Sequence, residues 1–597
     1  MTQQITESAT DPDAPRTPGP ARRPSFEPRR LAFALRRPLA TLPWVVCAVA
    51  LLLPVVGFLL VALSPRAVGQ GGSWFTLDNF RQVLSGWTAQ ALLDSLLVGI
   101  GAAVLATAVA TALAWATERT TLRGRALWRL LLWALLLAPS YLESLGWSWL
   151  VEPQGVLARL LGHNPTALYS VVFGPVGVVW VLASRGVPFA YLAVAGLIRN
   201  MGREFEDAAR THGASRLATV RVVLPILGPG LWAGLAIVFA ESISDYGVAG
   251  TLAAQAHFPI ATFAMEQSIA TFPAQFGPAS AMGWLLLLLV ALALYVQRRS
   301  LRGRSFAVLS GRTRPAVRSR LTPLRQALGL TGAIGFFGLA LGVPAFGAAA
   351  AALLPSDGRV SLSTLTLAHF SAVLHSGELT GPLGYSAALA ALAACAATVL
   401  GAVAGRALAR GGDGRSARAL DMLLITAIAL PSTLLACGYI FAFNLPLASD
   451  LGFNLYGTSS LLFLGYLAGV VPTSARLLSG TLGQVNGSLS EAARVHGRRP
   501  AAAWTGSVLP LVAGGLVWSW LIAFCGTLLE LPVSQLLAPP GQEPLSVAIT
   551  KHLAGYDLGG GAAMTDLVVL GALAVVALAL LLLRRLNPAA HRLEALT

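Results

Sequence analysis

Long apolar runs alternate with short polar breaks along most of the chain. A helix that crosses the hydrocarbon core of a bilayer needs about 20 mostly apolar residues, and roughly twelve runs reach that length. Their approximate positions are 43–64, 92–115, 128–151, 170–196, 229–250, 279–297, 327–354, 385–408, 419–443, 458–480, 515–537 and 563–583. We therefore predict an all-α polytopic membrane protein with about twelve transmembrane helices.

The composition and the charge pattern support a lipid environment. Of the 597 residues, 55% are hydrophobic and only 11% are charged, whereas soluble domains carry about 25% charged residues. A formal net charge of +16 would suit a nucleic-acid ligand, but the basic residues are concentrated in alternate breaks between the runs. This is the pattern of cytoplasmic loops in membrane proteins, so we predict no nucleic-acid partner.

The same charge pattern sets the expected topology. Both termini are predicted to be cytoplasmic, with a disordered Pro- and Arg-rich tail at 1–40 and a short tail at 587–597. A basic segment at 298–325 is predicted to be a cytoplasmic linker between two six-helix halves, 41–297 and 326–586.

Internal similarity supports the two halves. Four landmarks recur in the same order: "TLDNFRQVLSG" with "TLAHFSAVLHSG", "APSYL" with "LPSTL", residues 187–213 with 471–497, and "SDYGVAGTLA" with "LELPVSQLLA". Because six is an even number of spans, the halves run in the same direction through the membrane as a parallel repeat.

A polar segment is also duplicated, as "FEDAARTHGASRLATVRVVLP" and "LSEAARVHGRRPAAAWTGSVLP". In the second copy, Ser488 and Glu491 have the spacing of a capping box, and Gly497 suits a left-handed helix stop. Two consecutive alanines leave one face of the short helix with little bulk. We expect such a helix at the cytoplasmic surface to dock closely against another protein.

These segments resemble the EAA loops of binding-protein-dependent ABC importer permeases. The matching residues are Asp207, Ala208, Ala209, Gly213 and Pro225 in loop 1, and Glu491, Ala492, Ala493, Gly497 and Pro510 in loop 2. The resemblance implies a type I importer fold in the bacterial inner membrane, two ATPase copies bound to these coupling loops, and a substrate-binding protein on the outer side. The first copy departs from the family pattern by Asp207 in place of Glu and by one residue fewer before Pro225.

The chain lacks the sequence of an ATPase. A P-loop requires G-x-x-x-x-G-K-[ST], and the single lysine, Lys551, follows threonine in a predicted outer segment. We therefore predict a transport subunit without enzymatic activity or a cofactor of its own, and ATP and Mg used by the partner ATPase.

Four acids within or at the ends of the predicted spans are candidates for a translocation path: Glu143, Glu241, Asp245 and Glu530. Ionisable residues in the membrane usually face a cavity or a partner. The alternative is that they pair with arginines or lie at the outer interface. Arg185 and Arg476 are expected to extend toward the cytoplasmic end of their spans.

The segments "SDYGVAG" and "ELPVSQLLA" further resemble the corresponding segments of fused ferric-iron permeases, which implies a ferric substrate. Permeases for thiamine, phosphonate or polyamine remain alternatives, as do an ion-coupled secondary transporter and a membrane enzyme for lipid-linked substrates. Metal ligands remain unassigned, because the histidines of the predicted outer loops lack ligand spacing. These are His257, His369, His375 and His552.

Overall fold

The computed structural model describes most of the chain after residue 51. The described ranges are 52–65, 75–201, 211–213, 215, 223–301, 318–355, 364–411, 415–428, 430–485, 488–555 and 557–586. Residues 50–597 form one compact unit. The predicted tails at 1–40 and 587–597, and most of the predicted linker, lie outside the described residues.

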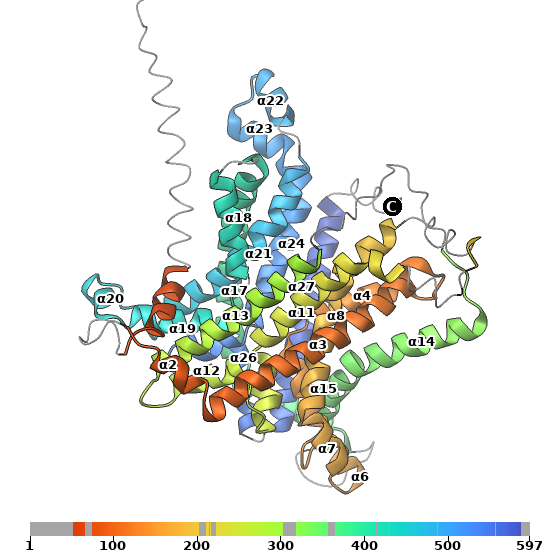
Figure 1. The fold of residues 1–597 in the computed structure, drawn as a ribbon, viewed down its shortest axis with the longest axis vertical. Helices are drawn as coiled ribbons and strands as arrows, with labels where there is room; N and C mark the ends of the chain where they lie inside the picture. The colour runs from red at the N-terminus through yellow and green to blue at the C-terminus, as the bar shows by residue number, and fades with distance from the viewer. Residues whose placement is uncertain are drawn as a thin grey trace, which may run out of the picture. The chain divides into compact units, whose positions relative to one another are not determined.

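The first part of the chain is helical (Figure 1). After a helix at Leu52–Val61 come α2 (Asp78–Val83), α3 (Gly86–Arg119), α4 (Arg125–Leu137), α5 (Ser140–Val151), α6 (Val156–Leu161), α7 (Thr166–Val172), α8 (Pro175–Asn200), α11 (Gly228–Ser244), the π-helix η1 (Ala249–Ala253), α12 (Ala261–Ala270) and α13 (Phe276–Leu301).

The remainder repeats this order. It comprises α14 (Pro323–Phe337), the π-helix η2 (Gly338–Gly342), α15 (Val343–Leu353), α16 (Ala368–His375), α17 (Thr380–Gly411), α18 (Arg415–Ile428), α19 (Ser432–Phe443), α20 (Pro446–Asp450), α21 (Ser459–Gly483), α22 (Ser488–Val495), α23 (Pro500–Ser507), α24 (Leu509–Leu528), α25 (Pro532–Leu537), α26 (Leu545–Ala554) and α27 (Leu558–Leu586). An isolated parallel bridge in the described part joins Thr120 to Ser319.

The all-α polytopic class is confirmed, whereas the number of twelve spans stays a prediction. Within the described ranges, eight helices are long and apolar enough to cross a membrane, or up to ten if each of two bent pairs is one span. The bends, of 95° and 100°, fall at Pro139 and Pro431, because proline restricts the residue before it and cannot donate to the preceding turn. Two further apolar helices, Leu52–Val61 and the 17-residue α11, follow closely on segments that lie outside the described ranges, 1–51 and 216–222.

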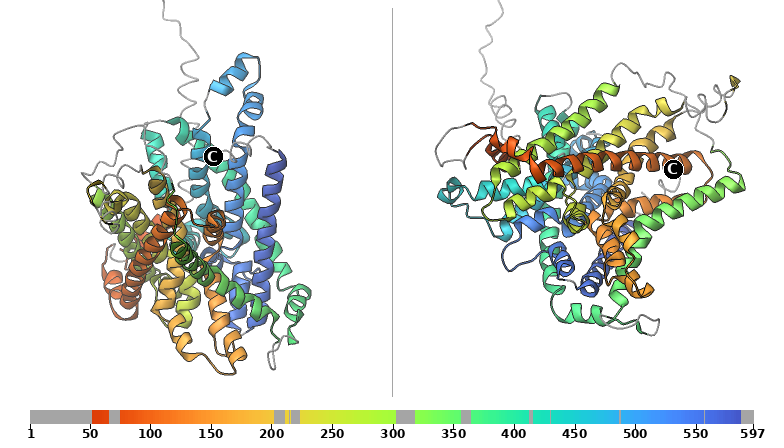
Figure 2. Two further views of the ribbon diagram at one scale, coloured as in Figure 1. Left: turned by 90° about the vertical axis from the view of Figure 1, so that its right-hand side faces the viewer. Right: turned by 60° about the horizontal axis from the view of Figure 1, so that its bottom comes forward.

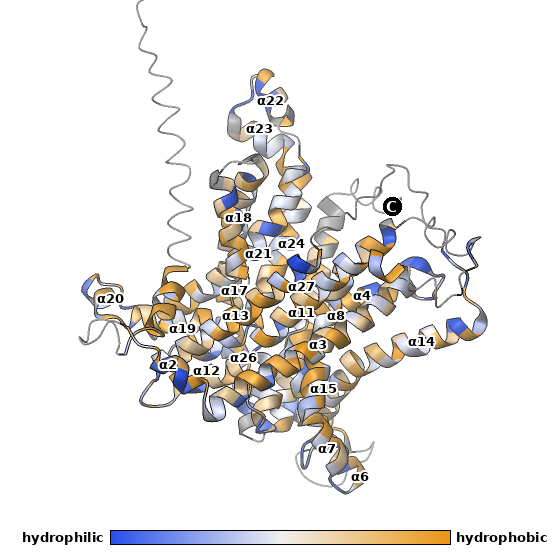
Figure 3. Cartoon of the chain, in the orientation of Figure 1, coloured by the Kyte–Doolittle hydropathy of each residue, from blue (hydrophilic) through white to orange (hydrophobic). Residues whose placement is uncertain are grey.

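Each half contains a bundle of three helices, and the helices are equivalent in the two halves. Helices α3, α8 and α11 pack together in the first half, and α17, α21 and α24 pack together in the second. Small residues allow close contact: a Cβ added at Gly405 would lie 2.7 Å from the backbone nitrogen of Ser479 in α21. Figure 2 shows these bundles from two further sides, and in Figure 3 hydrophobic residues dominate the helices whereas hydrophilic ones gather mainly at loops and helix ends.

The two halves also contact each other reciprocally. Helix α5 packs on α15 and α27 of the second half, and α19 packs on α12 and α13 of the first. Gly146 in α5 lies against the backbone of Pro344, and Gly438 in α19 lies against the backbone of Val55 in the helix Leu52–Val61. Gly146 and Gly438 occupy equivalent positions in the sequence repeat. Each half therefore contacts the other through the same part of its surface, as subunits do in an interface with two-fold symmetry.

Candidate coupling loops and intramembrane polar cluster

The second coupling loop forms a short exposed helix, α22, which packs on α23 (Figure 1). Glu491 and Ala492 are exposed, and Val495 is 86% exposed. The structure describes α22 from Ser488 onward, and residues 486 and 487 lie outside the described residues, so the capping box stays a prediction.

The predicted helix stop at Gly497 is present. Its φ is +80°, and the amide of Arg498 donates to the carbonyl of Ala493 at 3.2 Å. Only glycine adopts this left-handed conformation without a steric cost. Pro510 lies in the first turn of α24, which carries the chain away from the loop.

The first coupling loop is described only in part. Asp207, Ala208 and Ala209 lie outside the described residues, while Gly213 has φ +75°, close to the value of Gly497. Pro225 lies in the helical turn that precedes α11. The two loops therefore share a left-handed glycine and a proline at the start of the next long helix.

Asp245 and Glu530 accept equivalent hydrogen bonds from the backbone. Asp245 Oδ1 accepts a hydrogen bond from the amide of Val248 at 2.8 Å, and Glu530 Oε1 accepts one from the amide of Val533 at 3.0 Å. Each acid thus satisfies backbone donors at the start of the helical turn that follows it. The sequence repeat predicted that these two acids occupy equivalent positions, and their hydrogen bonds agree with that prediction.

Their backbone carbonyls are also held alike. The hydroxyl of Thr262 donates to the carbonyl of Asp245 at 2.9 Å, and that of Ser546 donates to the carbonyl of Glu530 at 2.5 Å. A second matched pair was not singled out from the sequence: Ser95 Oγ accepts from the amide of Ala261, and Ser386 Oγ from that of Leu545, both at 2.8 Å. Its only sequence signal is a shared serine nine residues after the matched glycines Gly86 and Gly377.

The positive charge of Arg185 in α8 acts on three of the four candidate acids. Glu143 of α5, Glu241 of α11 and Asp245 at the end of α11 all interact electrostatically with its guanidinium. Glu143 is buried, and the hydroxyl of Ser184 lies 2.6 and 2.8 Å from its two carboxylate oxygens. Glu530 instead takes its hydrogen bonds from Val533 and Ser534.

The expectation that Arg185 extends to the cytoplasmic end of its helix is wrong. Its Nη1 donates to the carbonyls of Leu135 and Leu136, the former at 3.3 Å, and its guanidinium lies 5.7 Å from the Phe189 ring centroid. Arg185 is about 20 Å from the end of α8 at a rise of about 1.5 Å per residue, too far for its side chain to reach. Arg476 is partly exposed and forms an ion pair with Asp421 at 2.6 Å.

This polar cluster belongs to one half only. The repeat places Leu435, Gly469 and Gly526 at the positions of Glu143, Arg185 and Glu241, respectively. Glu241 and Gly526 are both exposed, so the same open position carries a carboxylate in the first half and no side chain in the second. The matched acids Asp245 and Glu530 thus lie in unlike electrostatic surroundings.

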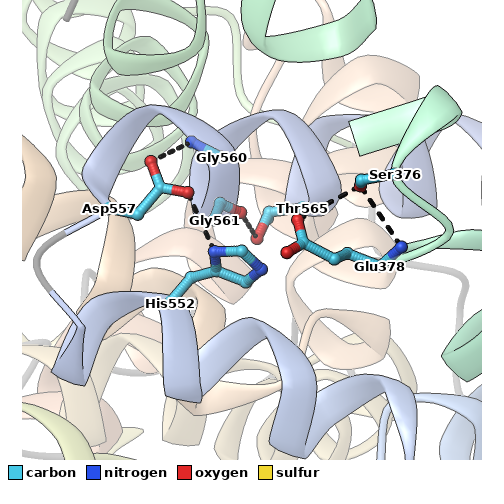
Figure 4. A network of polar contacts seen from close by, with 7 residues as sticks. All are labelled: Ser376, Glu378, His552, Asp557, Gly560, Gly561 and Thr565. Carbon is cyan, nitrogen blue, oxygen red and sulfur yellow. Dashed lines mark hydrogen bonds and ion pairs between the residues drawn. The ribbon is translucent and has the colours of Figure 1, made fainter. Parts of the chain in front are cut away.

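The predicted outer side contains a polar cavity of about 480 Å³ between the segment 154–164 and helices α15, α16 and α27. His369, on its wall, shares a hydrogen bond between Nε2 and the carbonyl of Leu354 at 3.0 Å. Nearby, Asp557 accepts from the amide of Gly560 at 3.0 Å and contacts His552 Nδ1 at 2.9 Å (Figure 4). Among the described residues, no group of three or more His, Cys, Asp and Glu side chains is arranged to hold a metal ion.

Comparison with known proteins relates the chain to transport permeases. No protein-family model matches it. A probable ABC transporter permease of Sinorhizobium fredii is 26% identical over 69% of this chain and 73% of its own length. A ferric transport system permease of Actinobacillus pleuropneumoniae is 22% identical over 85% and 73%, and an Fe(3+)-transport system permease of Haemophilus influenzae is 23% identical over 88% and 93%.

The two ferric transport permeases match 85% and 88% of this chain, so these similarities extend over both halves. Together with the long apolar helices they make the protein a multi-pass membrane protein. The chain is therefore a homologue of ABC transporter permeases and resembles the ferric transport permeases among them.

Proposed function

We propose that this chain is the permease subunit of an ATP-driven importer that moves ferric iron, or a ferric complex, into the cytoplasm. The observation that carries the substrate is the similarity to a ferric permease of Haemophilus influenzae over 88% of this chain. The segments "SDYGVAG" and "ELPVSQLLA" at Asp245 and Glu530, which resemble those of ferric permeases, support the same substrate.

The partners follow from the duplicated loops. Two ATPase copies dock on the exposed helix α22 and on its counterpart in the first half, and a binding protein delivers the substrate to the outer loops. The chain lies in the bacterial inner membrane with both termini in the cytoplasm. The basic residues around the coupling loops fit that side of the membrane.

The mechanism is alternating access without covalent chemistry in this chain. The ATPases close on ATP, and each coupling helix transmits this movement through the proline-started helix that follows it, α11 or α24. At the far ends of those helices lie Asp245 and Glu530, so the acids would move with the coupling loops. Hydrolysis then resets the two halves.

The first test is uptake of radiolabelled ferric iron by cells that lack this chain and by the same cells complemented with it. We expect iron uptake to be lost without the chain and restored with it, while uptake of labelled thiamine, a phosphonate and putrescine is unchanged. Loss of one of these control substrates with intact iron uptake would replace ferric iron by that substrate and keep the permease function.

The energy source distinguishes the proposed ATP-driven importer from an ion-coupled secondary transporter. In vesicles that contain the purified transporter with its ATPase, uptake should require internal ATP and persist when the ion gradients are collapsed. Uptake that follows an ion gradient and ignores ATP would overturn the importer proposal.

A further inference from the structure

The cytoplasmic end of α3 contains charged residues that are almost fully buried. Glu118 and Arg119 are 8% and 5% exposed. Ionised side chains are seldom buried to this extent unless they are paired and hydrogen-bonded. Neither residue belongs to the coupling loops or to the polar cluster around Arg185, so their burial requires a separate explanation.

One set of contacts holds the end of α8. Glu118 accepts a hydrogen bond from the Tyr191 hydroxyl at 3.2 Å and forms an ion pair with Arg199 at 3.4 Å. Arg119 Nη2 donates to the carbonyl of Met201 at 2.6 Å. Met201 directly precedes the segment 202–210, which contains the first coupling motif. The two buried charges thus fix the point at which the chain leaves α8 for that loop.

A second set of contacts holds the segment that leads into the second half. The amide of Ser319 donates to the carbonyl of Arg119 at 2.9 Å, and the amide of Thr121 donates to the carbonyl of Ser319 at 3.1 Å. These are the bonds of the parallel bridge between Thr120 and Ser319. Leu321 follows, with its amide 3.3 Å from the Thr121 hydroxyl, and α14 begins at Pro323.

The arrangement belongs to the first half. The matched serines Ser95 and Ser386 place Ala409 and Arg410 of α17 at the positions of Glu118 and Arg119. A carboxylate is therefore missing at the equivalent position, and α17 instead approaches α21 through glycine, with Gly405 against the backbone of Ser479. The repeat of the fold therefore does not account for the buried carboxylate of Glu118.

We propose that Glu118, Arg119, Thr120 and Ser319 form a cytoplasmic bracket that stays closed through the transport cycle. The bracket makes the ends of α3 and α8 and the start of α14 move as one body, so displacement of the first coupling loop reaches the second half directly. Glu118 and Arg119 are positioning residues in this inference, which rests on the proposed ATP-driven function.

The first test is a disulfide across the bridge in the double variant Thr120→Cys and Ser319→Cys, within the full chain and its ATPase complex. A protease site inserted in 302–317 allows the cross-link to be detected, because cleaved fragments stay joined only when the bond has formed. We expect the oxidised transporter to keep the uptake rate of the reduced one. If uptake stops on oxidation and returns with reductant, while the single-cysteine variants stay active, the proposal that the bracket stays closed through the transport cycle is wrong.

The second test weakens the bracket. Glu118→Gln and Arg119→Gln should raise the number of ATP molecules hydrolysed per ion imported by about threefold or more, because hydrolysis continues while movement is lost between the halves. Arg119→Lys should restore much of the coupling, since an ammonium can still donate to the Met201 carbonyl. Asp421→Asn is the matched control, because it removes an exposed ion pair in the second half.

The readouts separate this inference from the proposed function. If the native chain does not import iron but its ATPase is stimulated by another substrate, the same ratio is measured with that substrate. An unchanged ratio in both glutamine variants, with assembly intact, would show that Glu118 and Arg119 only stabilise the fold and would overturn the inference.

Discussion

At the scale of single residues, the acids at the ends of α11 and α24 have two separable properties. Their oxygens accept backbone hydrogen bonds from Val248 and Val533, and their charge lies at the far end of a helix that follows a coupling loop. The first property needs only an acceptor oxygen. The second needs the charge itself, so amide substitutions distinguish them.

We expect Asp245→Asn and Glu530→Gln to fold normally and to lower the rate of uptake. The amide oxygen still accepts the bond from the following turn, whereas the charge proposed to line the path is lost. Asp245→Ala should also cost about 1 kcal/mol of stability, as loss of a helix cap does. The measurements are uptake kinetics and thermal unfolding of the purified protein. Unchanged uptake in both amide variants would leave the acids with a capping role alone.

At the scale of elements, a left-handed glycine ends the coupling segment in each half. Gly213 and Gly497 have φ of +75° and +80°, and a Cβ added at either would meet no atom within 4 Å. Substitution therefore acts through backbone conformation and not through a clash. An L-residue in this conformation costs about 1–2 kcal/mol, which changes the direction in which the chain leaves the helix.

Replacement of both glycines by alanine should reduce uptake and weaken binding of the ATPase, because α22 and its counterpart would no longer end at the same place. Binding is measured by co-purification and uptake in vesicles. Gly514→Ala, in α24, is the matched control, since a Cβ there also meets no atom within 4 Å and its φ is not left-handed. Normal uptake in the double variant would argue against a coupling role for these loops.

At the scale of the whole molecule, the two halves are joined by contacts that occur twice. A Cβ at Gly146 would lie 2.5 Å from the carbonyl oxygen of Pro344, and one at Gly438 would lie 2.9 Å from the Cα of Val55. Both obstacles are backbone atoms of a helix in the other half. The halves can approach this closely only because each of these positions is glycine.

We expect Gly146→Ala and Gly438→Ala to destabilise the protein by similar amounts, about 1–3 kcal/mol each, because the added methyl group overpacks the interface. The midpoint of thermal unfolding in detergent should fall for both. Gly571→Ala in α27, where a Cβ would contact nothing within 4 Å, provides the control. A large effect of one substitution and none of the other would contradict reciprocal contacts.

The sequence alone determined the local features. The apolar runs predicted the long helices, the prolines of "APSYL" and "LPSTL" marked the breaks between α4 and α5 and between α18 and α19, and Gly497 marked the end of α22. Each depends on residues that are close in the chain, where periodicity, proline geometry and glycine conformation act directly. The duplication also matches Asp245 with Glu530, and their backbone hydrogen bonds agree with this match.

Only the tertiary structure decided which of these residues meet. It showed that two apolar runs bend sharply at a proline and that Arg185 donates to two backbone carbonyls inside the bundle. It also showed that Glu118 and Arg119 contact α8, and that the backbone of Arg119 meets Ser319 on the approach to α14. Arg119 and Ser319 are separated by 200 positions in the chain, and no periodicity specifies such a contact. It arises from how the helices pack, which depends on the shapes of many side chains together.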